Sequence, residues 1–462
     1  MNYRFFLPVL LSFVLTGSLS ARRLGEAVDS LISVTGFLKT SEVGVAVYDL
    51  NEGCFLYRCN SQKLFRPAST QKVITAVTAL SLLGEDFCFK TSLVCSGDIV
   101  GDSLLGDLLV VGGLDPLFSD DDMNSLVDKL YNKGIRHISG NLVPDVSLMD
   151  SIYWGAGWSW DDAPGYYQPY VSPLMLNSGY VDVSVSPSSR GIRPKVKVTP
   201  SSPFYSVNNQ ALSLTPSAGK LEVSRNWLEG GNEIVVTGNC SSPYNCKLSI
   251  FRSSDFFVTT LLSRLNSKGI TVSGSDTGIA RFACDSVETS TGLSSVMEKA
   301  LKKSDNLCAE SMFIMMGSRL PDSPKTSFSQ GAEAVRMYMQ DVLQRSPDDC
   351  SVNDGSGLSP YNLVSPELMI DYLRLGAGNK LFLSSLPVAG VDGTLRNRMK
   401  SGKACGNVRA KTGSVTGVSA LAGYALQTSS GHLLAFVIFN QNFLKSKDAR
   451  NFQDKLCELL CK

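Results

Sequence analysis

Alternating apolar and polar residues near both ends of the chain predict two β-hairpins. In the first, Val43–Leu50 and Cys54–Arg58 flank the short turn Asn51-Glu52-Gly53. In the second, Ser419–Gln427 and His432–Asn440 repeat the pattern close to the C-terminus. Strands this short need partners, so we expect both hairpins to belong to a larger sheet.

Helical periodicity lies outside these hairpins, in Arg22–Val34 and again in Asp448–Cys461. The last segment places four apolar residues on one face: Phe452, Leu456, Leu459 and Leu460. Because each end supplies a helix and a hairpin, we expect one sheet built from both termini. That apolar face then docks on the sheet, or alternatively on a membrane surface.

The middle of the chain, residues 89–283, is rich in β-branched alternation, glycine, proline and serine, which predicts mostly β structure. Helical spacing resumes at Leu293. The predicted fold is therefore α/β (α+β): an antiparallel sheet flanked by helices, interrupted by mostly β inserted domains. Its two parts are residues 21–88 and 284–462, with residues 89–283 inserted.

The charge balance indicates which partners are improbable, and the first twenty residues indicate where the protein is located. The 462 residues include 43 basic and 42 acidic ones, without a basic block, which speaks against nucleic acid or an anionic membrane as partner. Phe5–Val14 is apolar but too short to span a bilayer, and small residues follow at Ser18 and Ser20. We expect a signal peptide over residues 1–20, cleaved near Ser20, and a periplasmic protein.

Twelve cysteines in an exported chain permit disulfides. Cys240 and Cys246 bracket a loop-like segment and are the candidate pair. Cys54 and Cys59 bound a predicted strand, which places them roughly 16 Å apart and beyond disulfide reach.

The scarcity of histidine excludes several hydrolase classes. Only His137 and His432 occur, with no G-x-S-x-G elbow and no H-E-x-x-H segment. We therefore expect no metal and no cofactor. A hydrolase of this composition needs Lys, Asp, Glu or Tyr as its base.

One segment supplies such a base. Ser69 and Lys72 form an S-x-x-K that opens an apolar stretch ending at Gly84, so the helix should be buried nearly all round. Spacing of three puts both side chains on one face, and burial lowers the pKa of Lys72 so that it can accept a proton. A helix cap is the alternative for Ser69. Ser217 and Lys220 show the same spacing, but in a loop-like context.

Two further short motifs follow in order. Ser304-Asp305-Asn306 lies between two predicted helices, where a loop can aim a hydroxyl and an amide into a cleft; a capping turn is the alternative. Lys411-Thr412-Gly413 lies within Val408–Val415, a predicted edge strand, where glycine lets a substrate backbone approach. An ordinary bulged strand is the alternative.

The ordered set S-x-x-K, S-x-N, K-T-G resembles the penicillin-binding serine peptidases. More narrowly, the chain is similar to the low-molecular-mass D-alanyl-D-alanine carboxypeptidases/endopeptidases of the peptidase S13 type, which carry a large insertion after the first motif. Further matching segments are Arg66–Lys72, Trp158–Asp162, Asp354–Ser359 and Gly393–Leu395. The resemblance identifies residues 21–88 and 284–462 as a transpeptidase-like catalytic domain.

The resemblance implies a two-step acyl transfer on peptidoglycan stem peptides, with β-lactam antibiotics acylating the same serine. Ser69 is then the nucleophile and Lys72 its base, while Ser304 relays a proton and Asn306 holds the substrate amide. Lys411 supplies positive charge.

The resemblance also implies substrate-binding residues. Thr412 and Ser414 bind the terminal carboxylate beside Gly413, and the backbone N–H groups of Ser69 and Ser414 hold the oxyanion. Asp162, with Asp161 second, is the candidate for the free amino group of the stem peptide; a solvated acidic loop is the alternative.

Two other functions stay open at this point: a serine β-lactamase or esterase on the same scaffold, and an inactive peptidoglycan-binding relative. The sequence also leaves open a homodimer, a peripheral membrane contact, and the balance between carboxypeptidase and endopeptidase activity.

Overall fold

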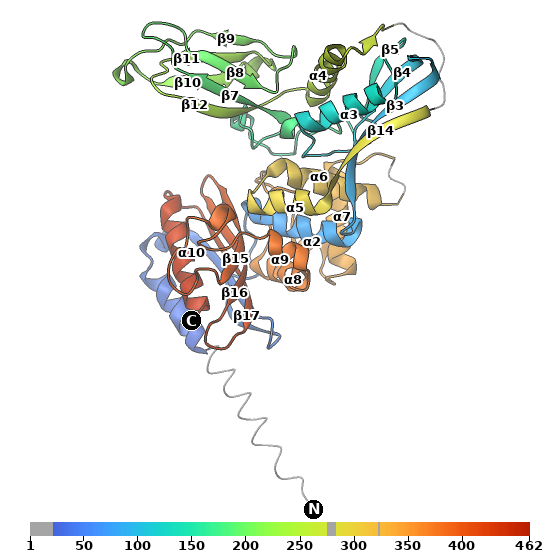
Figure 1. Ribbon diagram of the computed structural model, residues 1–462. Coiled ribbons are helices and arrows are strands. Elements are labelled where there is room, and N and C mark those ends of the chain that lie inside the picture. Colours follow the sequence, from blue (N-terminus) through green and yellow to red (C-terminus); the bar gives the residue numbers. More distant parts are fainter. Residues whose placement is uncertain (1–21, 275–282, 322–323) are drawn as a thin grey trace, which may run out of the picture. The chain divides into compact units, whose positions relative to one another are not determined.

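The computed structural model describes residues 22–274, 283–321 and 324–462 (Figure 1). The predicted signal peptide lies outside these residues. The chain divides into two compact units. Unit 1 contains residues up to Leu82 together with Met297–Asp305 and Ala332–Lys462, and unit 2 contains Leu83–Val296 and Asn306–Gly331.

Unit 1 is built on a five-stranded antiparallel sheet of order β15-β16-β17-β1-β2. The strands are β1 Glu42–Asp49, β2 Cys54–Cys59, β15 Val408–Val415, β16 Val418–Leu426 and β17 Leu433–Gln441. Both predicted hairpins are present, and β1 pairs with β17 along its whole length. One sheet from both termini is therefore confirmed.

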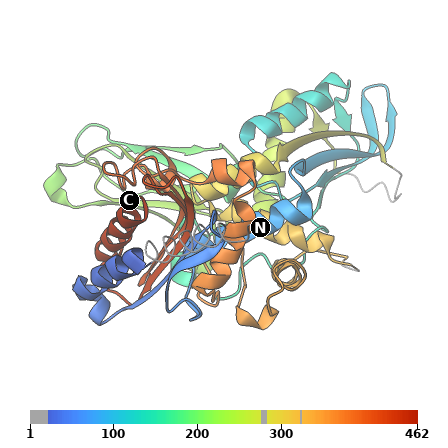
Figure 2. The same cartoon turned by 90° about the horizontal axis from the view of Figure 1, so that it is seen from below.

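Helices cover both faces of this sheet. On one face, residues 22–34 and α10 (Ser446–Leu460) lie side by side (Figure 2) and bury Val28, Phe452 and Leu456 against Phe436 and other sheet residues. On the other face, α8 (Pro366–Gly376) contacts β1, β16 and β17. The apolar face of α10 is thus covered by the sheet and is not exposed for a membrane.

The remaining elements around the motifs are short helices. They are η1 Gly36–Lys39, η2 Ala68–Thr70, α2 Gln71–Leu83, α5 Leu293–Lys302, α6 Asn306–Met316, η7 Gly317–Arg319, α7 Phe328–Asp341, η8 Pro347–Asp349, α9 Lys380–Ser385 and η9 Gly393–Leu395. The apolar sequence of α2 is buried almost throughout, as its composition predicts, and the helix stops before Gly84 at φ +86°. Helices α5 and α6 flank Ser304, also as predicted.

Unit 2 holds three sheets, with strand orders β13-β5-β4-β3-β14 (β6 pairs with β4), β12-β7-β8 and β10-β11-β9. The strands are β3 Cys88–Val100, β4 Ser103–Val111, β5 His137–Ile138, β6 Leu142–Asp145, β7 Tyr180–Ser186, β8 Lys195–Thr199, β9 Val207–Asn209, β10 Leu221–Arg225, β11 Ile234–Gly238, β12 Tyr244–Ser249, β13 Thr271–Val272 and β14 Ala283–Gly292. Short helical turns are η3 Trp160–Asp162, η4 Asn177–Gly179, η5 Pro216–Ala218 and η6 Trp227–Glu229.

The mostly β character of residues 89–283 is confirmed, but this segment also contains α3 (Asp120–Asn132) and α4 (Ser253–Lys268). A capping box between Ser119 and Asp122 starts α3. In both helices only one face is buried against the sheets, so their apolar repeats are diluted by polar residues.

Cys240 and Cys246, the candidate disulfide pair, are both free thiols in the structure. Cys54 and Cys59 are also free and lie at opposite ends of β2, as the strand length requires. In the described part of the chain, no helix combines the length and the apolar composition needed to cross a membrane.

Candidate active site

The first part of the site is the turn that begins α2. Ala68 adopts the left-handed conformation at φ +45°, and Thr70 closes the turn by donating from its hydroxyl to the Pro67 carbonyl at 2.6 Å. Left-handed backbone is rare for a residue with a Cβ and is found mainly where surrounding structure enforces it. The turn leaves Ser69 only partly buried, directly before the buried helix.

Lys72 lies one helical turn further on and is fully buried. Its Nζ donates to Ser69 Oγ at 2.9 Å and to the carbonyl oxygen of Ser356 at 2.8 Å. The predicted pairing of Ser69 with Lys72 is therefore present in the structure. This geometry allows the lysine amine to take a proton from the serine hydroxyl.

The loop that carries Ser356 is organised by a buried carboxylate. Asp354 accepts hydrogen bonds from the backbone N–H groups of Gly357 at 2.7 Å and Ser359 at 2.6 Å, and from Asn362 Nδ2 at 2.7 Å. Because several donors fix its geometry, the loop can hold the Ser356 carbonyl against Lys72.

Gly357 brings this loop onto the turn before Ser69. It adopts φ +83°, and a Cβ at this position would lie 1.8 Å from the Ala68 carbonyl oxygen. Only glycine meets both demands, conformational and steric. The approach packs the loop against Ala68, the residue before the candidate nucleophile.

The second part of the site joins Ser304 to Lys411. Ser304 sits between α5 and α6 at φ +59°, and its hydroxyl accepts from Lys411 Nζ at 2.9 Å. Lys411 is fully buried and also donates to the Thr412 carbonyl at 2.7 Å. Burial, and then the charge of Lys72, hold the pKa of Lys411 well below its usual range. Two buried amines in one cluster resist carrying two positive charges.

The edge of β15 forms the third part. Ala389 N–H donates to the Val408 carbonyl and Ala410 N–H to the Pro387 carbonyl, so residues 408 and 410 direct their backbone groups toward the side of the strand that faces away from β16. By the two-residue period of a strand, Thr412 and Ser414 do the same, beyond the point where this pairing ends. Their backbone groups can therefore pair with an extended substrate.

Gly413 sets this edge against the nucleophile. A Cβ at Gly413 would lie 2.7 Å from the Pro67 carbonyl oxygen and 3.1 Å from the Ser69 nitrogen. The absence of a side chain thus brings the Ser69 N–H next to β15.

Unit 2 contains the other two predicted residues. Asn306 begins α6 and donates from Nδ2 to the Tyr167 carbonyl oxygen at 2.6 Å. The Tyr167 hydroxyl donates to Asp162 Oδ1 at 3.0 Å. Burial and this bond to Asp162 raise the pKa of Tyr167, which therefore stays a donor at neutral pH. Tyr167 links Asn306 to Asp162.

Sequence reasoning did not assign roles to Ser356, Thr394 or Tyr167. Thr394 accepts a hydrogen bond from the Thr412 hydroxyl at 2.8 Å. Ser356 and Thr394 lie in two segments that resemble the family, Asp354–Ser359 and Gly393–Leu395. These segments could have indicated that both residues lie near the site.

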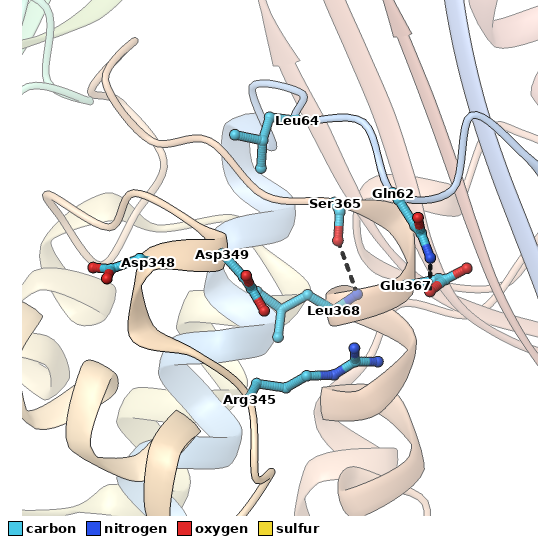
Figure 3. Close-up of a pocket in the computed structure, with 8 residues that line it drawn as sticks. All are labelled: Gln62, Leu64, Arg345, Asp348, Asp349, Ser365, Glu367 and Leu368. Atoms are coloured by element: carbon cyan, nitrogen blue, oxygen red, sulfur yellow. Dashed lines mark hydrogen bonds between the residues drawn. The ribbon is translucent and has the colours of Figure 1, made fainter.

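A separate hollow of about 350 Å³ in unit 1 is lined by Gln62, Leu64, Arg345, Asp348, Asp349, Ser365, Glu367 and Leu368 (Figure 3). Its least exposed charge, Glu367, accepts from Ser61 Oγ at 2.7 Å and pairs with Arg58, while Arg345 pairs with Asp371. The hollow contains none of the motif residues. Within the described residues, no group of three or more His, Cys, Asp or Glu side chains is arranged to hold a metal ion.

Comparisons with known proteins identify the family of this chain. Residues 24–462 match the D-Ala-D-Ala carboxypeptidase 3 (S13) family. The D-alanyl-D-alanine carboxypeptidase of Actinomadura sp. strain R39 is 30% identical over 87% of this chain and 78% of its own length. The D-alanyl-D-alanine carboxypeptidase DacB of Haemophilus influenzae is 30% identical over 89% of this chain and 88% of its own length.

A solved structure shows the same fold. The crystal structure of penicillin-binding protein 4 (dacB) from Haemophilus influenzae superposes with a TM-score of 0.81 at 28% identity, covering 94% of this chain and 99% of that one. A second structure of that protein, in complex with a β-lactam, gives a TM-score of 0.75. The predicted fold class and resemblance are both confirmed: this chain belongs to the D-Ala-D-Ala carboxypeptidase 3 (S13) family of serine hydrolases.

Proposed function

We propose that the protein is a serine-type D-Ala-D-Ala carboxypeptidase and/or endopeptidase that acts on peptidoglycan stem peptides through an acyl-enzyme on Ser69. The observation that carries this proposal is the hydrogen bond from a fully buried lysine, Lys72, to Ser69 Oγ at 2.9 Å. An amine held in this way is desolvated, next to the nucleophile, and able to act as its base. Family membership supplies the substrate class.

In the acylation step, neutral Lys72 takes the proton of the Ser69 hydroxyl as Oγ attacks the carbonyl carbon between the two D-alanines. The backbone N–H groups of Ser69 and Ser414 hold the oxygen that becomes negative. When the C–N bond breaks, the proton passes through Ser304 to the departing amine, and the terminal D-alanine leaves. The stem peptide remains as an ester on Ser69.

Lys72 and Lys411 share a buried environment in which one positive charge is favoured over two. The two amines are buried in one cluster, and the charge of one disfavours the charge of the other. A substrate carboxylate bound beside Lys411 favours protonation of that lysine, which in turn favours a neutral Lys72. Substrate binding therefore favours the state in which Lys411, beside the carboxylate, carries the single positive charge of the pair.

Thr412 and Ser414, on the open part of β15, bind the terminal carboxylate next to Gly413. Water then attacks the acyl-enzyme, with Lys72 taking the proton, and the ester is hydrolysed. A β-lactam acylates Ser69 by the same route, but its ring-opened product has no separate leaving group to depart, and the enzyme stays blocked.

Asn306 binds the substrate amide, and Asp162 binds the free amino group of the stem peptide, with Asp161 as the second candidate. The support for Asp162 is its contact with Tyr167, whose carbonyl also accepts from Asn306. If Asp162 binds a cation, Asp162→Asn raises KM for stem peptides with a free side-chain amine and leaves acetylated peptides unchanged. An equal change for both peptides would contradict this assignment.

We also propose the catalytic domain as residues 21–88 and 284–462, with residues 89–283 inserted, and a periplasmic location after cleavage near Ser20. N-terminal sequencing of the protein recovered from the periplasmic fraction tests the location. Residence in the cytoplasm with an intact N-terminus would contradict it.

A gel with fluorescent penicillin, run beside an assay of D-Ala release, tests the function. Wild type should label stably and release D-Ala, Ser69→Ala should do neither, and Ser217→Ala should behave as wild type. Absence of labelling in wild type overturns the proposal. A label that appears briefly and is then lost, because the penicilloyl ester on Ser69 is rapidly hydrolysed, indicates a β-lactamase instead.

A further inference from the structure

A threonine outside the three motifs presents its hydroxyl to the K-T-G strand. Thr394, in the turn η9 (Gly393–Leu395), accepts a hydrogen bond from Thr412 at 2.8 Å between the two Oγ1 atoms. Thr394 is exposed, and Thr412 is partly exposed. Both hydroxyls are therefore accessible beside the open edge of β15.

The turn that carries Thr394 is held firmly. Asp392 accepts from the Val388 backbone N–H at 2.8 Å through one carboxylate oxygen, and pairs with Lys302 through the other. Gly393 adopts φ +56°, and a Cβ there would lie 2.8 Å from the Lys302 carbonyl oxygen and 3.0 Å from Pro387 Cβ. The end of α5 and the segment paired with β15 thus fix the position of the turn.

The negative charge of Asp392 is offset by its ion pair with Lys302. Burial alone would raise the pKa of Asp392, but the hydrogen bond from Lys302 and the charges of Lys302 and Arg409 outweigh it and lower the pKa. The carboxylate is therefore ionised and matched by cations at neutral pH.

The positions of the two hydroxyl protons determine which threonine can donate a hydrogen bond to a carboxylate. A threonine hydroxyl has one proton to donate and can also accept. Thr412 gives its proton to Thr394. The Thr394 proton has no acceptor among the residues that the structure describes, so it is the proton of this pair that an incoming anion can receive.

We infer that Thr394 is a further carboxylate-binding residue: it donates its hydroxyl proton to the terminal carboxylate of the substrate while accepting from Thr412. This inference rests on the proposed function and deepens it, because a free terminal carboxylate distinguishes D-Ala-D-Ala ends from internal peptide bonds. Thr412 then acts on the carboxylate partly through Thr394, and the two hydroxyls form one unit.

The test compares two reactive thioester peptides, one ending in a free carboxylate and the other in its methyl ester. Thr394→Val keeps the shape and removes the hydroxyl, and Thr394→Ser restores the hydroxyl. With the carboxylate peptide, Thr394→Val should lose about 10- to 100-fold in kcat/KM, the range for a hydrogen bond to a charged group. With the methyl ester, the loss should stay within about twofold, and Thr394→Ser should recover most of the activity.

Thr40→Val is the matched control, because Thr40 is an exposed threonine of unit 1 whose hydroxyl, within the described part of the chain, hydrogen-bonds only to a local carbonyl, that of Phe37. It should change neither rate. A double-mutant cycle adds a second measurement: Thr412→Val should cost less in a Thr394→Val background than in wild type, since Thr412 acts on the carboxylate partly through Thr394.

Equal losses on both peptides would show that Thr394 is only structural, and no loss on either would show that it does not reach the carboxylate; both outcomes overturn the inference. If Thr394→Val fails to fold, as judged by its thermal unfolding, Thr394→Ala carries the same comparison. A wild type that cleaves neither peptide is a different result, because it overturns the proposed function itself.

Discussion

Two segments of this chain share the S-x-x-K spacing, but one lies in a buried helix and the other in an exposed loop. Lys72 is fully buried and donates to Ser69 Oγ at 2.9 Å. Lys220 is exposed, and Ser217 Oγ contacts Thr215 Oγ1 at 3.1 Å instead. The same letters at the same spacing therefore give one candidate nucleophile with its base and one surface loop.

The residues around each segment explain the difference. The first S-x-x-K continues into α2, whose apolar residues bury the lysine. The second contains Gly219, at φ +114°, so the backbone leaves the helical region after the three residues of η5. Spacing brings a serine and a lysine together only if a helix forms, and chemistry follows only if that helix is buried.

The largest expected effect separates the two serines. Ser69→Ala should lower the rate of D-Ala release by at least about 10⁴-fold, because the covalent step has no other nucleophile. Ser217→Ala should match wild type. Mass spectrometry of the penicillin-labelled protein locates the adduct, and an adduct on Ser217 would refute the distinction.

The two lysines should differ almost as much. Lys72→Met removes the base and should slow acylation by penicillin about 10²- to 10⁴-fold, the range for general base catalysis. Lys220→Met should leave the rate within about twofold, since this side chain is solvated. Stopped-flow acylation measures both, and equal rates for Lys72→Met and wild type would exclude Lys72 as the base.

Two glycines extend the comparison to the backbone. Gly357→Ala and Gly219→Ala both force a Cβ into a positive-φ position, which costs about 1–3 kcal/mol of unfolding free energy. Only Gly357 also meets the Ala68 carbonyl, so its variant should lose about 1–3 kcal/mol more. It should also lose about 10²-fold in kcat/KM, because Ser69 shifts. Chemical denaturation measures the loss of stability, and D-Ala release measures the loss of activity. Retained activity in Gly357→Ala would show that this contact does not position Ser69.

The smallest expected effect is on stability, at Lys411. Because the pKa of Lys411 is lowered in the folded state, folding releases protons at pH values between that pKa and about 10.4, the usual lysine value. Wild-type stability therefore rises with pH in this window. Lys411→Met, although impaired in catalysis, should unfold at higher urea concentration at pH 7, and the advantage should shrink toward pH 10. Lys220→Met should show no such trend, and an advantage of Lys411→Met that grew with pH would contradict the assignment.

Local patterns were sufficient for much of the fold. Strand alternation located the hairpins of unit 1, and the apolar run after Ser69 predicted the buried helix α2. These features are encoded by residues within a few positions of one another, where helical and strand periods act directly. Helices α3 and α4 were missed, because each buries a single face among polar residues and lies in a segment dominated by strands.

By itself, then, the sequence determined the order of the three motifs, the elements that carry them, and the lysine that is the candidate base for Ser69. Only the tertiary structure decided that Ser304 pairs with Lys411, that the Ser356 carbonyl accepts from Lys72, and that Thr394 meets Thr412. These partners are separated along the chain by between 18 and 284 residues. Their meeting depends on how buried elements pack, which no local period records.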